Sequence, residues 1–224
     1  MNAIVLFGAP GSGKGTQAKM LSQCLGIPHV STGDMLRDRI RDGTTVATAV
    51  VATMQSGALV PDELVNALVE ERLSRRDATR GFILDGYPRT VAQAEHLSGW
   101  LDGRGIRELV IFLVVDYNII IGRLTGRRQC PRCGTLYNMV FQPPRVDMVC
   151  DLDGEPLMVR DDDRESVIRE RLEAYERQSE PVLDFYRAAQ RRIVQVDGGN
   201  DPPEMVFHRI CQSMEADDRS ENRR

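Results

Sequence analysis

The sequence contains no long hydrophobic run. No stretch approaches the roughly 18 apolar residues that a membrane span requires. The first ten residues, MNAIVLFGAP, lack the positively charged segment of a secretory signal peptide, and their apolar run is too short for one. We therefore expect a cytoplasmic protein that does not enter the membrane.

The sequence also has no excess of positive charge and few aromatic residues. Its 29 Lys and Arg residues face 33 Asp and Glu residues, the net charge is −4, and aromatic residues make up 5% of the chain. Nucleic-acid-binding domains usually carry a basic patch, which this composition does not favour. We expect neither nucleic acid nor a membrane surface as a partner. If the protein binds phosphates, its basic side chains must be gathered at one place.

The sequence also lacks an even number of cysteines, which a disulfide framework would require. The chain has five, and an odd number without a secretion signal argues against a disulfide framework and for thiols or metal ligands. Cys24 and Cys211 lie in apolar helical patterns and are predicted to be buried thiols. The other three, Cys130, Cys133 and Cys150, fall within 21 residues of one another.

Short apolar runs alternate with helical patterns along the 224 residues. The predicted strands are Ala3–Phe7, His29–Ser31, Gly81–Leu84, Leu109–Val114 and Ile193–Val196. The predicted helices are Gly15–Leu25, Gly33–Asp42, Thr45–Gln55, Pro61–Arg75, Thr90–Leu101, Tyr117–Arg127, Arg164–Ala189 and Pro203–Glu215. This alternation predicts an α/β fold with a mostly parallel sheet and helices on both faces.

The segment Gly126–Asp163 interrupts the alternation. It is rich in Cys, Pro, Asp and Gly and has no long apolar period. A loop of this length inside a compact domain is uncommon and often forms a lid over an active site. The charged segment from Ala216 to the end has no apolar anchor, and we expect it to be frayed.

A phosphate-binding loop follows the first predicted strand. The residues from Gly8 to Lys14, GAPGSGK, have the G-x-x-x-x-G-K spacing of a P-loop and open the first predicted helix. Backbone N–H groups of such a turn converge on phosphate oxygens, and the helix N-terminus and Lys14 add positive potential. A glycine turn with a solvated lysine is the alternative. Most P-loops place the Mg²⁺-binding hydroxyl directly after the lysine, but here Gly15 precedes Thr16, so we expect phosphates and waters to hold most of the metal shell.

Further motifs resemble the successive signatures of adenylate kinases. They are GAPGSGKGTQ from Gly8, STGDMLR from Ser31, GALVPDE from Gly57, GFILDGYPRT from Gly81, GRR from Gly126 and RDDD from Arg160. The resemblance covers Ile4 to about Gly199 and implies a nucleoside monophosphate kinase fold. It implies a core (1–30, with the P-loop), an AMP-binding insertion (31–60), more core (61–125), a lid (126–163), core again (164–215) and a charged flexible tail (216–224).

The same resemblance implies the reversible Mg²⁺-dependent transfer of a phosphoryl group, ATP + AMP = 2 ADP, in adenine nucleotide homeostasis. It assigns catalytic roles to Lys14, Arg89, Arg127, Arg160 and Arg171. It assigns ATP binding to Gly11, Ser12, Gly13, Lys14, Gly15, Thr16, Arg123, Arg127, Leu136, Tyr137 and Gly199. It assigns AMP binding to Thr32, Arg37, Ala58, Leu59, Val60, Gly86, Tyr87, Pro88, Arg89, Gln93, Arg160 and Arg171.

The chemistry agrees with these residue types. Phosphoryl transfer between two polyanions needs positioning, charge neutralisation and exclusion of water. Arginine suits these tasks because its planar guanidinium makes bidentate phosphate contacts. Asp85 is predicted to order the waters of Mg²⁺. The acceptor phosphate is already anionic and needs no general base, so the histidines His29, His96 and His208 receive no role.

Base selection depends on Thr32 and Gln93, which match the adenine-reading positions of AMP-specific kinases. Two rivals remain. One is a kinase for GMP, UMP, CMP or another small molecule such as shikimate. The other is a nucleic-acid-binding module with a vestigial P-loop, which the acidic net charge disfavours. We expect a monomer that binds ATP, AMP and ADP.

A metal site is predicted within the lid. Cys130-Pro-Arg-Cys133 is followed after sixteen residues by Cys150-Asp-Leu-Asp153, which is the spacing of a zinc ribbon with Asp153 as fourth ligand. Asp151 competes for the fourth place but lacks the two-residue spacer. Four ligands would close the shell around Zn²⁺ and make its role structural. Free cysteines in a loop are the alternative.

Overall fold

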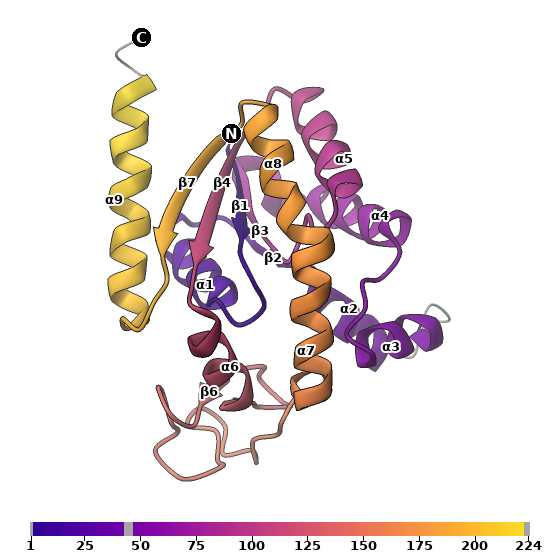
Figure 1. Cartoon of the computed structure of the whole chain (residues 1–224), viewed down its shortest axis with the longest axis vertical. Coiled ribbons are helices and arrows are strands. Elements are labelled where there is room, and N and C mark those ends of the chain that lie inside the picture. Colours follow the sequence, from indigo (N-terminus) through magenta and orange to yellow (C-terminus); the bar gives the residue numbers. More distant parts are fainter. Residues whose placement is uncertain (1, 43–46, 222–224) are drawn as a thin grey trace.

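The computed structural model describes residues 2–42 and 47–221. Its central sheet has five parallel strands in the order β2-β3-β1-β4-β7, so the predicted parallel sheet is confirmed (Figure 1). The bounds are β1 (Asn2–Phe7), β2 (His29–Ser31), β3 (Gly81–Asp85), β4 (Arg107–Val114) and β7 (Arg192–Asp197). The strand after β1 in sequence lies at an edge, and β1 pairs with β3 and β4.

Both faces of the sheet are covered, as the uninterrupted apolar sequence of β1 predicts. Alternate residues of β1 enter two separate cores, Val5 on one face and Ile4 on the other. The Val5 face is covered mainly by α4 (Asp62–Leu73), α5 (Val91–Asp102) and α8 (Glu180–Ala188). The Ile4 face is covered by α1 (Lys14–Leu25) and α9 (Pro203–Glu221). None of the described helices is long and apolar enough to cross a membrane.

The remaining helices lie around the carboxyl end of the sheet. They are α2 (Thr32–Arg41), α3 (Ala47–Gln55), α6 (Tyr117–Thr125) and α7 (Glu165–Ala174), with the short 3₁₀ turn η2 (Asp161–Asp163). Another 3₁₀ turn, η1 (Arg76–Arg80), leads into the amino end of β3. The first two residues of the helix predicted over Thr45–Gln55 lie outside the described residues. The single helix predicted over Arg164–Ala189 is divided by a π-helical turn, η3 (Tyr175–Ser179), between α7 and α8.

Two further expectations, about the end of the last helix and about two cysteines, differ from the structure. α9 continues past Glu215 to Glu221 rather than ending where the apolar pattern stops. Cys24 is exposed and Cys211 is only partly buried, so the prediction that both are buried thiols is wrong. Cys24 lies in the last turn of α1 beside Leu25, which is itself 44% exposed, and the apolar pattern there does not face the core.

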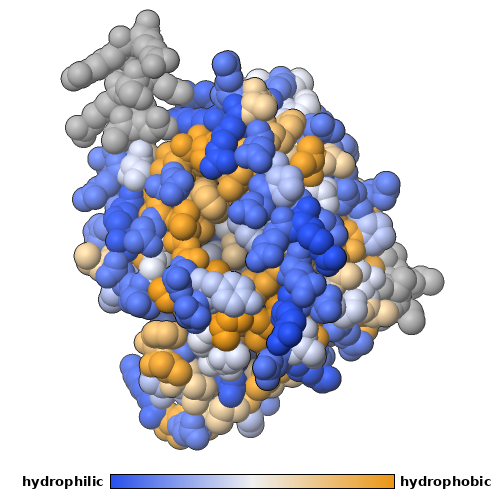
Figure 2. Space-filling model, viewed as in Figure 1, coloured by the Kyte–Doolittle hydropathy of each residue, from blue (hydrophilic) through white to orange (hydrophobic). Residues whose placement is uncertain are grey.

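The segment 126–163, predicted to be a lid and called the lid below, contains a small antiparallel sheet of β5 (Arg127–Gln129) and β6 (Leu136–Asn138). Strands of three residues are too short to produce a periodic signal, which explains why the sequence indicated a loop. Few lid side chains are buried together: Tyr137 and Leu157 pack with two of the cysteines. Apolar lid residues such as Val140 and Leu152 are instead more than 70% exposed. The lid forms the lower end of the molecule in the view of Figure 1 and Figure 2, where hydrophobic residues are visible at the surface.

A buried carboxyl group ties the sheet to two of its covering helices. Glu108 of β4 is 7% exposed and accepts hydrogen bonds from the hydroxyl groups of Ser98 (2.8 Å) and Tyr186 (2.9 Å). The guanidinium of Arg191 lies 3.8 Å away. Burial raises the pKa of Glu108, although the two hydroxyl hydrogen bonds and Arg191 oppose that rise.

This raised pKa predicts a pH-dependent stability difference between the protein and its Glu108→Gln variant. The unfolded carboxyl releases its proton near pH 4.5, but the folded one retains it to a higher pH. The free energy of unfolding should therefore fall in the wild type relative to Glu108→Gln as pH rises from about 4 to 8, by about 1.4 kcal/mol for each unit of pKa difference. Urea unfolding at several pH values measures it.

The exposed residue Glu95 of α5 provides the control, because Glu95→Gln makes the same change of charge in solvent. Its stability difference from the wild type should vary much less with pH. A Glu108→Gln difference that stays constant, or that moves in favour of the wild type as pH rises, would contradict the assignment.

Candidate active site

The carboxyl ends of the parallel strands open into one cleft of about 830 Å³. The loop after β1 and the segment after β3 both line it, and the lid and α2 contribute further walls. Ligands of open α/β sheets bind at this edge, outside the carboxyl ends of the strands. The volume lies in the upper part of the range for small-molecule pockets.

The P-loop turns from β1 into α1. Gly13 caps α1 in the left-handed conformation with φ of 98°, which a residue with a side chain rarely adopts. Gly15 faces Asp85, and a Cβ atom there would lie 3.2 Å from an Asp85 carboxylate oxygen. That close approach gives a physical reason why the serine or threonine expected after the P-loop lysine is replaced by glycine, with Thr16 following it.

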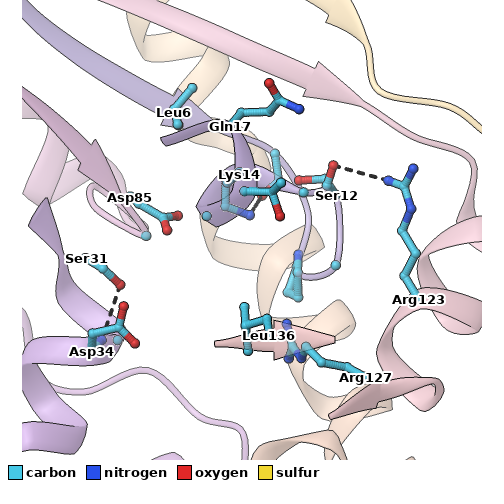
Figure 3. Close-up of a pocket in the computed structure, with 18 of the residues that line it drawn as sticks. Leu6, Ser12, Lys14, Gln17, Ser31, Asp34, Asp85, Arg123, Arg127 and Leu136 are labelled. Atoms are coloured by element: carbon cyan, nitrogen blue, oxygen red, sulfur yellow. Dashed lines mark hydrogen bonds between the residues drawn. The ribbon is translucent and has the colours of Figure 1, made fainter. Parts of the chain in front are cut away.

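Lys14 and Asp85 face the same part of the cleft (Figure 3). The Lys14 Nζ donates to the carbonyl oxygens of Gly8 (2.7 Å) and Ala9 (2.9 Å). Burial lowers the pKa of Lys14 to about 8, with Asp85 opposing the shift. Burial alone would raise the pKa of Asp85, but its hydrogen bond with His29 (3.3 Å) and the charge of Lys14 hold it below the usual range.

The segment after β3 forms the second wall. Arg89 donates from Nε to the carbonyl oxygen of Gly86 at 2.8 Å, and the Thr32 hydroxyl donates to the same oxygen at 2.8 Å. Ser179, in the π-helical turn, donates to the carbonyl oxygen of Arg89 at 2.9 Å. The π turn therefore fixes the main chain that carries Arg89, in keeping with the frequent occurrence of such turns at functional sites.

Two aspartates form ion pairs with the arginines of the lid and of α7. Arg160 makes a bidentate pair with Asp162, at 2.9 and 2.7 Å. Arg127 makes a bidentate pair with Asp163, which also accepts from Arg171 at 3.0 Å. The Asp163 side chain is fully buried. The pKa of Asp162 is held well below its usual range, because Arg171 and Arg160 outweigh the opposing effect of burial.

Arg123 of α6 joins two loops at the other end of the cleft. Its guanidinium donates to the carbonyl oxygens of Ser12 (3.3 Å), Gly198 (2.9 Å) and Gly199 (Figure 3 shows the Ser12 bond). The carbonyl oxygen of Gly199, a residue predicted to bind ATP, is therefore already an acceptor for Arg123.

Most of the predicted nucleotide-binding residues line this one cleft. Those brought together are Gly11, Ser12, Gly13, Lys14, Gly15, Thr16, Thr32, Arg37, Ala58, Leu59, Val60, Gly86, Pro88, Arg89, Gln93, Arg123, Arg127, Leu136, Tyr137, Arg160 and Arg171. Two are not among the lining residues. The Gly199 carbonyl oxygen accepts from Arg123. The Tyr87 residue is 1% exposed, and its hydroxyl donates to the Asn66 side-chain oxygen at 2.7 Å.

The predicted metal ligands also converge. The Sγ atoms of Cys130, Cys133 and Cys150 and a carboxylate oxygen of Asp153 all lie within 4.8 Å of one another. Cys133 and Cys150 have their sulfurs 3.6 Å apart, and the Cys130 sulfur lies 3.4 Å from Asp153. Tetrahedral coordination with Zn–S bonds of 2.3 Å separates sulfurs by about 3.8 Å, so the group fits a four-coordinate ion of this size. Asp151 instead accepts from the backbone N–H of Arg145 at 2.9 Å.

Comparison with known proteins identifies the family. A sequence profile described as adenylate kinase matches residues 6–191. The adenylate kinase of Thermoanaerobacter sp. (strain X514) is 44% identical over 212 residues, which cover 94% of this chain and 97% of that protein. That of Syntrophotalea carbinolica is 50% identical over 186 residues, covering 83% and 86%, and that of Anaeromyxobacter dehalogenans is 48% identical, covering 82% and 86%. The chain belongs to the adenylate kinase family.

The adenylate kinase motifs did not reveal every residue that shapes the cleft. Asp162 and Asp163 stand in the quoted RDDD motif, yet only the arginine received a role. His29 was assigned none, but it lies against Asp85. Asp62 was also overlooked, although it contacts Gln93 at 2.7 Å. The available signal was chemical: a cluster of buried arginines requires carboxylate partners, and aspartates beside those motifs were the candidates.

Proposed function

We propose that this chain catalyses the reversible transfer of a phosphoryl group from ATP to AMP, forming two ADP. The observation that carries the proposal is the convergence of cationic side chains from separate segments on one cleft that also contains the P-loop. Lys14, Arg89, Arg127, Arg160 and Arg171 all line it. Two polyanions can meet there only if such charges offset their repulsion.

We assign the P-loop side of the cleft to ATP and the side formed by α2 and the segment after β3 to AMP. Lys14 and the N-terminus of α1 would hold the donor phosphates, with Arg123 and Arg127 beside them. Arg37 and Arg89 would hold the acceptor phosphate. Arg160 and Arg171 would gather on the transferring group. Thr32 and Gln93, both 2% exposed and both lining the cleft, would read adenine.

Magnesium would accompany ATP and neutralise charge on its phosphate oxygens. The Asp85 carboxylate, held ionised beside Lys14, and the hydroxyl of Thr16 are the oxygen donors of this chain that fit such an ion. The residues themselves position the two nucleotides and exclude water when the lid covers the cleft.

Zinc is the metal that we propose for the lid, held by Cys130, Cys133, Cys150 and Asp153. The ligand set and its tetrahedral spacing support it. The lid buries too few apolar side chains to order itself by hydrophobic burial. A metal ion that cross-links the Cys130–Cys133 pair to the Cys150–Asp153 pair would supply the missing rigidity.

With Mg·ATP as donor, AMP should be preferred over GMP, UMP and CMP by at least about tenfold in kcat/KM, or about 1.4 kcal/mol. The reason is that Thr32 and Gln93 offer polar groups that the wrong base leaves unpaired. A coupled assay of diphosphate formation with each acceptor measures it. Equal use of GMP or UMP would overturn the adenylate assignment.

Elemental analysis of protein purified without chelator should find about one zinc per chain. Cys130→Ser with Cys133→Ser should lower the melting temperature by several degrees, because metal binding is coupled to folding of the lid. Activity at low temperature should persist in part, since no cleft cation is a metal ligand.

The matched control is Cys24→Ser with Cys211→Ser, which removes two thiols outside the lid and should leave the metal content unchanged. Two results would speak against a structural zinc. One is protein without bound metal, and the other is complete loss of activity on chelation with Mg²⁺ restored and the fold intact.

A further inference from the structure

We propose that Asp62 determines base specificity by fixing the orientation of the Gln93 side-chain amide. In that orientation the amide accepts a 6-aminopurine and rejects a 6-oxopurine. The inference rests on the proposed function, in which Gln93 reads the acceptor base. It adds a positioning residue that does not itself line the cleft.

Gln93 is held from two sides. It lies in the first turn of α5, and its Nε2 donates to the Asp62 carboxylate at 2.7 Å. Its Oε1 accepts from the backbone N–H of Arg89, also at 2.7 Å. Asp62 is the first residue of α4, so two helix starts and the segment after β3 meet at this side chain.

The chemistry of the two partners fixes which way the amide points. An ionised carboxylate can only accept hydrogen bonds, and a backbone N–H can only donate. The amide nitrogen must therefore face Asp62, and the amide oxygen must face Arg89. The reversed amide would place oxygen against oxygen and N–H against N–H, losing both hydrogen bonds and adding two repulsive contacts.

A fixed amide presents a fixed pattern to the base. Each amide atom has one protein partner within the described part of the chain, so one N–H hydrogen and one Oε1 lone pair remain for a ligand. Adenine offers an acceptor at N1 and a donor at its 6-amino group, which match that pair. Hypoxanthine offers a donor at N1 and an acceptor at its 6-oxo group, so both contacts are reversed. A site whose polar groups stay unpaired with the wrong base discriminates strongly against that base.

Thr90 completes the arrangement and makes it testable. Its hydroxyl accepts from the backbone N–H of Gln93 at 3.1 Å and donates to the second carboxylate oxygen of Asp62 at 2.7 Å. An asparagine at position 62 would have to turn its oxygen toward that hydroxyl proton. Its NH₂ group would then face Gln93 and favour the reversed amide, against the remaining restraint from Arg89.

The test is the ratio of kcat/KM for AMP to that for IMP, measured with Mg·ATP in the wild type and in Asp62→Asn. IMP differs from AMP only at the edge in question. The wild type should prefer AMP, and Asp62→Asn should lower the ratio at least about tenfold, the scale of one lost polar discrimination. Chromatography separates IDP from ADP and gives both rates.

Glu63→Gln is the matched control. Glu63 is the next residue of α4, is exposed, and carries the same charge at the same helix terminus. The substitution therefore repeats the change in net charge and helix-end electrostatics without touching Gln93, and the AMP to IMP ratio should stay as in the wild type. Where Asp62→Asn does not fold, Asp62→Ser also removes the acceptor-only group, and the same loss of discrimination is expected.

Gln93→Ala separates the two possible failures. If it abolishes discrimination while Asp62→Asn preserves it, Gln93 reads the base without help from Asp62, and this inference is overturned but the proposed function stands. If Gln93→Ala leaves discrimination intact, the base is read elsewhere, and both the inference and the assignment of Gln93 are wrong. An Asp62→Asn protein that loses AMP and IMP activity equally would show that Asp62 is merely structural.

Discussion

The concentration of positive charge beside the P-loop is the constraint on which the structure depends. Lys14, Arg89, Arg127, Arg160 and Arg171 approach one another within a partly buried cleft. Like charges in a low dielectric repel, and burial lowers the pKa of Lys14 to about 8. Such a cluster is stable only with carboxylates beside it or with a polyanion in the cleft.

Carboxylates lie beside these cations and offset their mutual repulsion. Asp162 and Asp163 pair with the arginines of the lid segment and of α7, and Asp85 lies close enough to Lys14 for their charges to interact. Asp162 and Asp163 lie at the end of the lid segment, and Asp85 is the last residue of β3. The lid segment and α7 are thus joined by the ion pairs of Asp163 with Arg127 and Arg171. Preorganised charge of this kind is the main protein contribution to phosphoryl transfer.

The sequence predicted most of this framework from local signals. Each predicted strand appears within two residues of its expected ends, because buried parallel strands produce uninterrupted apolar runs. The P-loop and the lid cysteines were predictable because backbone geometry and metal coordination demand fixed spacing. The family motifs supplied the arginines, and the cleft brings those arginines together.

The features that could not be predicted from the sequence depend on contacts between distant segments. Strand order follows from tertiary packing, and the π turn at Tyr175–Ser179 has no periodic signature that distinguishes it from an uninterrupted helix. The roles of Asp62 and His29 arise from neighbours 31 and 56 residues away along the chain. Tyr87 was included with its motif neighbours, but its side chain belongs to the core.

The central claim is that cations brought together at the carboxyl edge of the sheet drive phosphoryl transfer. The most direct measurement is the kcat/KM of Lys14→Met with Mg·ATP and AMP, alongside its far-ultraviolet circular dichroism and melting temperature. The account predicts a loss of about 10²–10⁵ in kcat/KM with the fold retained, the scale on which single cations act in this chemistry. Near-normal kinetics in a folded Lys14→Met protein would contradict it.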